Sequence, residues 1–191
     1  MSTMEIKITG FGGQGVILTG MLIGKAAAIY EGKNAVLVQS FGPEARGGAC
    51  AAQVIVSDEP IFYPYVKTPQ VLITLSQEAY SLYIPEIAPN GILIYEKDLV
   101  NPENLPAGVK PYPIPSTALA EELGKKIVLN IVTVGFFTAI TGIVKPEAMK
   151  KAIQDSVPKG TIDLNLKAFD EGYAYFSQNN QPEADPPLAG K

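Results

Sequence analysis

Short runs of apolar residues recur along the chain and alternate with longer apolar segments. The short runs predict strands at residues 5–9, 35–41, 50–58, 71–76 and 91–96. The longer segments predict helices at residues 14–30, 77–84, 117–123, 146–156 and 165–178, and one more that begins at about Asn130 with that residue as its N-cap. This alternation favours an α/β fold in a single domain, a Rossmann-like, doubly wound and mostly parallel sheet.

Some segments carry more specific expectations. Residues 35–41, "AVLVQSF", are almost continuously apolar, as in the middle of a parallel sheet. The alanine-rich strand at residues 50–58 and the proline-broken stretch after it suggest an additional hairpin-like excursion. Residues 98–115 are rich in proline and are expected to be mainly loop. Gly20 and Gly24 lie one turn apart in a predicted helix, where they permit close backbone packing.

The ends of the chain and its apolar stretches bound the domain. The last residues, "NNQPEADPPLAGK", have almost nothing to bury, so we expect a Rossmann-like domain at residues 1–178 and a flexible tail at residues 179–191. The two longest apolar stretches, at residues 16–30 and 129–144, carry polar side chains. Both fall short of the roughly 20 residues that cross a bilayer and are expected to be buried helices.

Composition excludes several kinds of site. The chain has 191 residues, a net charge of −4 and no basic cluster, so neither nucleic acid nor an anionic membrane is an expected partner. It contains no histidine and one cysteine, Cys50. Zinc, iron–sulfur and haem sites of the usual kinds, and Ser-His-Asp or Cys-His catalysis, are therefore excluded within this chain. The lone thiol fits a reducing compartment, and the amino terminus lacks a signal-peptide pattern, so a cytoplasmic location is expected.

The strongest local motif is the glycine-rich sequence "GFGGQG". Gly10, Gly12 and Gly15 satisfy G-x-G-x-x-G between a predicted strand and a predicted helix. Such a loop lets backbone approach a phosphate, and the helix amino terminus offers it free N–H groups. A dinucleotide site also needs an acid at the end of the next strand, where this chain has Gln39 and Ser40. NAD and FAD are thus disfavoured, which leaves tight strand–helix packing, another anionic ligand or a partner surface.

A second glycine-rich loop, "SFGPEARGG", follows the next predicted strand. Because the carboxyl ends of parallel strands share one edge of a sheet, the two loops are expected to lie side by side, where open α/β sheets hold ligands. Arg46 either reaches a phosphate or carboxylate with two parallel hydrogen bonds or forms a local ion pair with Glu44. Ser40 either donates its hydroxyl to a ligand or only satisfies the turn.

The two loops in this order, "GFGGQGVILTG" and "QSFGPEARGG", are followed by "VIVSDEPI" and a late "LNLKAFDEGYAYF". Together they resemble the gamma subunit of the 2-oxoacid:acceptor (ferredoxin) oxidoreductases, in the pyruvate/ketoisovalerate oxidoreductase gamma family, over about residues 4–178. The second loop is most similar to the 2-oxoglutarate or branched-chain type, and aryl-substituted 2-oxo acids stay open. The resemblance implies a complex that oxidatively decarboxylates a 2-oxo acid to acyl-CoA and reduces ferredoxin or another acceptor.

The resemblance also implies how the subunits divide the work. Thiamine diphosphate, Mg and the iron–sulfur clusters would belong to alpha, beta and ferredoxin-like partner subunits. This chain would support coenzyme A binding and assembly, with no catalytic residue or metal ligand of its own, and would be inactive when isolated. The residues carried over to the coenzyme A site are Gly12, Gly13, Gln14, Gly15, Ser40, Phe41, Gly42, Arg46, Gly47 and Gly48. The alternative is a self-contained NAD(P)-binding or nucleotide-sensing Rossmann domain.

The proline-broken segment "IFYPYV" carries three aromatic side chains, Phe62, Tyr63 and Tyr65. They either anchor a partner, since tyrosine is enriched at interfaces, or pack within the chain. Without its partners the chain is expected to expose apolar patches or to self-associate.

Overall fold

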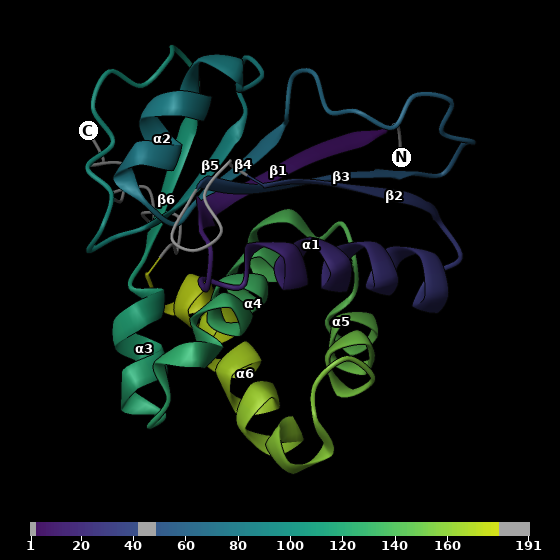
Figure 1. Cartoon of the computed structure of the whole chain (residues 1–191), viewed down its shortest axis with the longest axis vertical. Helices are drawn as coiled ribbons and strands as arrows, with labels where there is room; N and C mark the ends of the chain where they lie inside the picture. The colour runs from purple at the N-terminus through teal and green to yellow at the C-terminus, as the bar shows by residue number, and fades with distance from the viewer. Residues whose placement is uncertain (1–2, 42–48, 180–191) are drawn as a thin grey trace, which may run out of the picture.

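The computed structural model describes residues 3–41 and 49–179, which form one six-stranded sheet with helices on both faces (Figure 1). The strands are β1 (Met4–Phe11), β2 (Asn34–Phe41), β3 (Ala49–Ser57), β4 (Val71–Thr74), β5 (Ile92–Glu96) and β6 (Lys110–Ile114). Their order across the sheet is β2-β3-β1-β4-β5-β6. Strands β1, β4, β5 and β6 run parallel, and β3 runs antiparallel to both of its neighbours. The predicted α/β class and mostly parallel sheet are confirmed.

The helices cover the two faces unequally. Figure 1 shows α2 (Gln77–Tyr83) on one face and the other helices on the opposite face. The others are α1 (Val16–Lys25), α3 (Ser116–Glu122), α4 (Leu129–Thr141), α5 (Pro146–Gln154) and α6 (Ile162–Asn179). A turn of π-helix, Ala26–Tyr30, extends α1, so the helix predicted at residues 14–30 is largely confirmed. Among the described residues, no helix is long and apolar enough to cross a bilayer.

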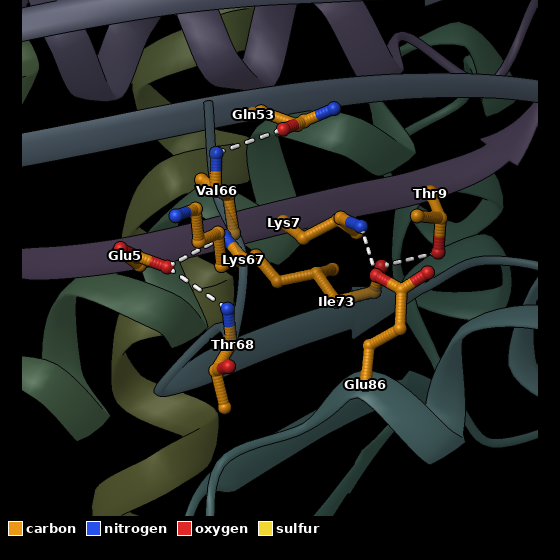
Figure 2. Close-up of polar contacts among 9 residues, drawn as sticks. All are labelled: Glu5, Lys7, Thr9, Gln53, Val66, Lys67, Thr68, Ile73 and Glu86. Atoms are coloured by element: carbon orange, nitrogen blue, oxygen red, sulfur yellow. Dashed lines mark hydrogen bonds and ion pairs between the residues drawn. The ribbon is translucent and has the colours of Figure 1, made fainter. Parts of the chain in front are cut away.

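Strand β1 alternates between the two layers. Ile6 and Ile8 are fully buried in the large core under α1, α4 and α6. Lys7 points to the α2 side, where its side chain is also buried. Figure 2 shows its ammonium beside the carboxylate of Glu86, with which it forms an ion pair, and the ring of Tyr83 lies 4.8 Å from Nζ. The charged partner and the aromatic face explain how the sheet tolerates a buried lysine.

The segment between β3 and β4 is held to the sheet by polar contacts from neighbouring strands (Figure 2). The Glu5 carboxylate accepts the backbone N–H groups of Lys67, at 2.9 Å, and Thr68, at 3.0 Å. Gln53 on β3 accepts the N–H of Val66 at 3.0 Å. These bonds pair backbone groups of an irregular segment that lacks a ladder of its own.

The alanine-rich strand β3 runs antiparallel to its neighbours, as the predicted excursion requires, but the proline-broken stretch after it forms no strand among the described residues. The placing of β2 in the middle of a parallel sheet is wrong. β2 pairs antiparallel with β3, from Asn34 opposite Ser57 to Phe41 opposite Cys50. Because β3 separates it from β1, β2 forms an edge of the sheet within the described ranges. Its apolar run has another cause: the side chain of Leu37 faces α1 at Gly20, where an added Cβ would lie 3.0 Å from it. One covering helix makes an edge strand as apolar as a central one.

Residues 110–114 form β6, where the sequence predicts mainly loop. The N–H of Lys110 donates to the carbonyl of Gly91 at 2.9 Å. The backbone hydrogen-bonding groups of residues 110 and 112 therefore point toward β5. Since the backbone N–H groups of successive strand residues point to opposite edges, the N–H positions of Pro111 and Pro113 face away from β5, where no described strand needs them. A proline-rich strand is therefore compatible with this edge, and local sequence does not reveal it.

Helices α4 and α6 cross with their backbones in contact. A Cβ on Gly172 would overlap the carbonyl oxygen of Val132, and a Cβ on Gly135 would overlap the carbonyl oxygen of Phe169. Helix α6 begins at Ile162, about one turn before the predicted start, and ends at Asn179. The domain boundary at residue 178 and the flexible tail stay predictions, because residues 180–191 lie outside the described ranges.

Candidate functional site

The first glycine-rich loop lies at the carboxyl edge of the sheet, between β1 and α1. Gly12 and Gly13 are exposed, and Gly13 (φ 99°) and Gly15 (φ 74°) adopt the left-handed region that glycine favours. Gly15 is the N-cap of α1, and within the described residues no side chain caps this end and no acid lies in the first turn. The first N–H groups of α1 thus stay available, and the helix dipole adds partial positive charge.

Gln14 braces this loop. Its Oε1 accepts the N–H of Phe11 at 2.6 Å, and its Nε2 donates to the carbonyl of Leu75 at 2.7 Å. The side chain therefore joins the end of β1 to the residue after β4. Both the oxygen and the nitrogen of the amide are already hydrogen-bonded within the chain. Gln14 therefore acts on a ligand by positioning the loop backbone.

The amino terminus of α4 meets the same loop. The prediction that Asn130 is the N-cap is wrong, because Val128 occupies that position and Asn130 lies in the first turn. Asn130 is 3% exposed, and a Cβ added to Gly15 would lie 2.5 Å from its Cγ and 2.7 Å from its Nδ2. Nδ2 is buried without a hydrogen-bond partner in the part of the chain that the structure describes. The signal in the sequence was one amide within the apolar run "LNIVTVGFF".

The strands that carry the two loops end at the same edge. Gly10 and Phe41 both pair with Cys50, so one strand separates the ends of β1 and β2 by about 10 Å, two strand spacings. β3 lies between the two strands, and the expectation that the loops lie side by side stays a prediction, because residues 42–48 lie outside the described residues. Ser40, near the end of β2, is exposed. The remaining expected site residues, Gly42, Arg46, Gly47 and Gly48, lie outside the described residues.

This topology also bears on the dinucleotide alternative. In a Rossmann dinucleotide site the strand after the first helix lies beside β1 and carries the acid for the ribose at its end. Here β3 occupies that neighbouring position and runs in the opposite direction. The end of β2 carries Gln39 and Ser40, so neither the position nor the residue type fits ribose binding.

Glu96 at the end of β5 is buried at the same edge but serves helix α3. It is 1% exposed and accepts the backbone N–H of Thr117 at 3.0 Å and its hydroxyl at 3.2 Å. Burial raises the pKa of the Glu96 carboxyl above its ordinary value, although the hydrogen bonds from Thr117 and Asp98 oppose this. The group is a buried cap for α3, and its protonation is coupled to folding.

We expect Glu96 to make folding pH-dependent. Because its pKa is higher in the folded than in the unfolded chain, the folded state binds the proton more tightly. Its contribution to stability is fully present below the unfolded pKa and is lost as pH rises through the raised folded pKa. Glu96→Gln should flatten this fall in the free energy of unfolding, measured by urea denaturation from about pH 4 to 8. A variant with the slope of the wild type would contradict the assignment.

Two further features of the surface and core follow from side-chain exposure. Phe62, Tyr63 and Tyr65 are 94%, 54% and 51% exposed, and the two tyrosine rings contact each other with centroids 5.6 Å apart. None of the three belongs to the buried core. Their role as partner anchors stays a prediction.

Cys50 is buried in the large core, and burial raises the pKa of its thiol. This agrees with packing as a small apolar side chain.

The sequence of the chain is similar to those of known proteins over most of its length. Residues 5–175 match the model of the family described as pyruvate ferredoxin/flavodoxin oxidoreductase. The chain is 51% identical over 171 residues to 2-oxoglutarate synthase subunit KorC of Methanocaldococcus jannaschii, an alignment that covers 88% of this chain and 91% of the relative.

Two solved structures are similar over nearly the whole chain. The gamma subunit of a keto/oxoacid ferredoxin oxidoreductase from Geobacter sulfurreducens is 39% identical with a TM-score of 0.78, covering 90% of this chain and 96% of that one. The 2-oxoglutarate:ferredoxin oxidoreductase from Magnetococcus marinus, with 2-oxoglutarate, coenzyme A and succinyl-CoA bound, is 28% identical with a TM-score of 0.86. That match covers 97% of this chain and 32% of the longer one.

Proposed function

Because this chain belongs to the pyruvate ferredoxin/flavodoxin oxidoreductase family, as a gamma-type subunit of a 2-oxoacid:ferredoxin oxidoreductase, we propose that it supports coenzyme A binding in that complex. The reaction is the oxidative decarboxylation of a 2-oxo acid to acyl-CoA. The relative that is 51% identical favours 2-oxoglutarate over branched-chain or aryl substrates. The observation that carries the proposal is the glycine-rich loop, whose uncapped helix end lies at the ligand-binding edge of the sheet.

The residues present fit the phosphates of coenzyme A. Gly13 and Gly15 hold the loop open beside the first N–H groups of α1, and Gln14 fixes the loop to β4. When bound, coenzyme A supplies the thiol that receives the acyl group. Ser40 and Phe41 end the strand on the other side of β3, and we assign the rest of the site to the loop that follows.

The same residue types argue against the other cofactors in this chain. With no histidine and one buried cysteine, it offers no ligand set for an iron–sulfur cluster. The clusters are therefore assigned to partner subunits. Thiamine diphosphate and Mg are assigned to alpha, beta and ferredoxin-like partners in the cytoplasm because the family resemblance implies it. In the Magnetococcus protein the equivalent region makes up about a third of a longer chain, which supports close packing against further domains. Exposed Phe62, Tyr63 and Tyr65 are suitable anchors for such a partner.

Calorimetry of the purified complex tests the proposal. Coenzyme A is expected to bind, and NADH is expected to give no heat. In a separate activity assay of the complex with a panel of 2-oxo acids, 2-oxoglutarate should give the highest kcat/KM. Tight NADH binding without a response to coenzyme A, or a native chain that purifies without thiamine-dependent partners, would favour a self-contained nucleotide-binding domain instead.

A charge variant supplies a sharper test. Gln14→Glu keeps an acceptor for Phe11, loses the donor to Leu75 and adds a negative charge at the start of α1. We expect its KM for coenzyme A to rise by about 10- to 100-fold through charge repulsion and loosening of the loop. Gln77→Glu is the matched control, because Gln77 bonds both the N–H and the carbonyl of Asn101 in the same way. If the two variants raised the KM for coenzyme A equally, the glycine-rich loop would not be part of the coenzyme A site.

A further inference from the structure

Two helix amino termini converge at the glycine-rich loop. Helix α1 begins after Gly15 and α4 begins after Val128, and within the described residues neither end has a side-chain cap or a first-turn acid. The contact between Gly15 and Asn130 brings the two ends together. Because both ends carry partial positive charge, their approach is unfavourable unless a negative group lies between them.

The other helices satisfy their amino termini from within the chain. Ser76 accepts the N–H of Ala79 at the start of α2, and Glu96 accepts the N–H of Thr117 in α3. Helices α5 and α6 have Glu147 and Asp163 in their first turns. Within the described residues, the two helices that lack such a group are the two that meet at the loop.

An independent observation points to a ligand at this place. Asn130 is only 3% exposed, and its Nδ2 lies against Gly15 without a hydrogen-bond partner among the described residues. A second buried asparagine, Asn165, shows the ordinary arrangement, since its Nδ2 donates to the carbonyl of Thr161 at 2.8 Å. A buried amide donor left unpaired costs free energy, and a bound acceptor removes that cost.

We propose that Asn130 Nδ2 completes, together with the glycine-rich loop, α1 and the start of α4, a site for the pyrophosphate of coenzyme A. The N–H of Leu129 donates to the carbonyl of Lys126, so α4 contributes through Asn130 and through the partial positive charge of its amino end. The inference rests on the proposed function and adds a binding residue to it. The first N–H groups of α1 and the Nδ2 of Asn130 are two sets of donors, which suit two linked phosphoryl groups better than one. The site therefore takes the pyrophosphate, and the 3′-phosphate lies elsewhere.

The test uses the purified complex and calorimetry with coenzyme A and with dephospho-coenzyme A, which lacks only the 3′-phosphate. Asn130→Asp replaces the donor by a negative charge and should raise the Kd of both ligands by about 30-fold or more. Asn130→Leu keeps the branching at Cγ, loses the donor and should raise both values by about 10-fold. Asn165→Asp, in a buried asparagine away from the loop, should leave both within about twofold.

Stability separates binding from a structural role. Without ligand, Asn130→Leu should fold at least as stably as the wild type, because it removes an unpaired buried amide. A structural asparagine would lose stability on this change.

The outcomes separate a failure of the proposed function from a failure of the role of Asn130. A wild-type complex that does not bind coenzyme A overturns the proposed function. If the wild-type complex binds coenzyme A and the Kd of Asn130→Asp lies within twofold of the wild-type value, or is no higher than that of Asn165→Asp, only the role of Asn130 is overturned. Weakened binding of coenzyme A with unchanged binding of dephospho-coenzyme A overturns the assignment to the pyrophosphate.

Discussion

Gly172→Ala is expected to lower the free energy of unfolding by about 3 kcal/mol or more. The new Cβ would overlap the carbonyl oxygen of Val132 and lie 3.1 Å from the backbone N of Phe136. Backbone atoms cannot rotate away as a flexible side chain can, so α4 and α6 would have to separate. Their separation would also part the ring of Phe136 from those of Tyr175 and Phe176, whose centroids lie 5.8 and 6.1 Å away.

Urea denaturation followed by circular dichroism measures this effect, and Gly24→Ala is its control. Gly24 lies within α1, and apart from its chain neighbours and the backbone of its own helix, no atom of the described residues lies within 4 Å of an added Cβ. The same substitution there should stabilise the chain by about 0.5–1 kcal/mol, because alanine favours a helix more than glycine does. If Gly172→Ala stayed as stable as the wild type, α4 and α6 would not cross this closely.

Gly15→Ala is expected to destabilise the chain by about 2–4 kcal/mol from two separable causes. Alanine at φ 74° is strained, and its Cβ would lie 2.5 Å from Cγ of Asn130. Gly32→Ala isolates the strain, because Gly32 has φ 67° and its added Cβ meets no atom of the described chain within 4 Å. We expect that control to cost about 1 kcal/mol.

A double-mutant cycle measures the contact between the loop and α4. Combining Gly15→Ala with Asn130→Ala removes the overlap with Cγ and Nδ2 of Asn130, but leaves the strain and the approach to its Cβ at 2.7 Å, so the two changes should couple by about 1–2 kcal/mol. Additive changes in the free energy of unfolding would mean that Gly15 and Asn130 are not in contact. The site in which Asn130 serves coenzyme A would then lose its geometry as well.

The parts of the site that the sequence predicted were those held by neighbours in the chain. The loop from Gly12 to Gly15 was located by its spacing, because a tight turn into a helix requires glycine at fixed positions. The role of Gln14 was not readable, since its partner Leu75 lies far along the chain. Asn130 resembled a helix cap locally, and only the tertiary structure shows that it lies against Gly15, buried and with its Nδ2 unpaired among the described residues.

By itself the sequence determined where most strands and helices lie, the α/β class and the start of α1, because side-chain periodicity and glycine spacing act over a few residues. Only the tertiary structure decided that β3 separates β2 from β1, that the N–H positions of Pro111 and Pro113 face away from β5, and that α4 begins at the glycine-rich loop. Each of these depends on which distant segments pair. Pairing is set by the burial of whole faces and the hydrogen bonds between strands, which no short stretch of sequence contains.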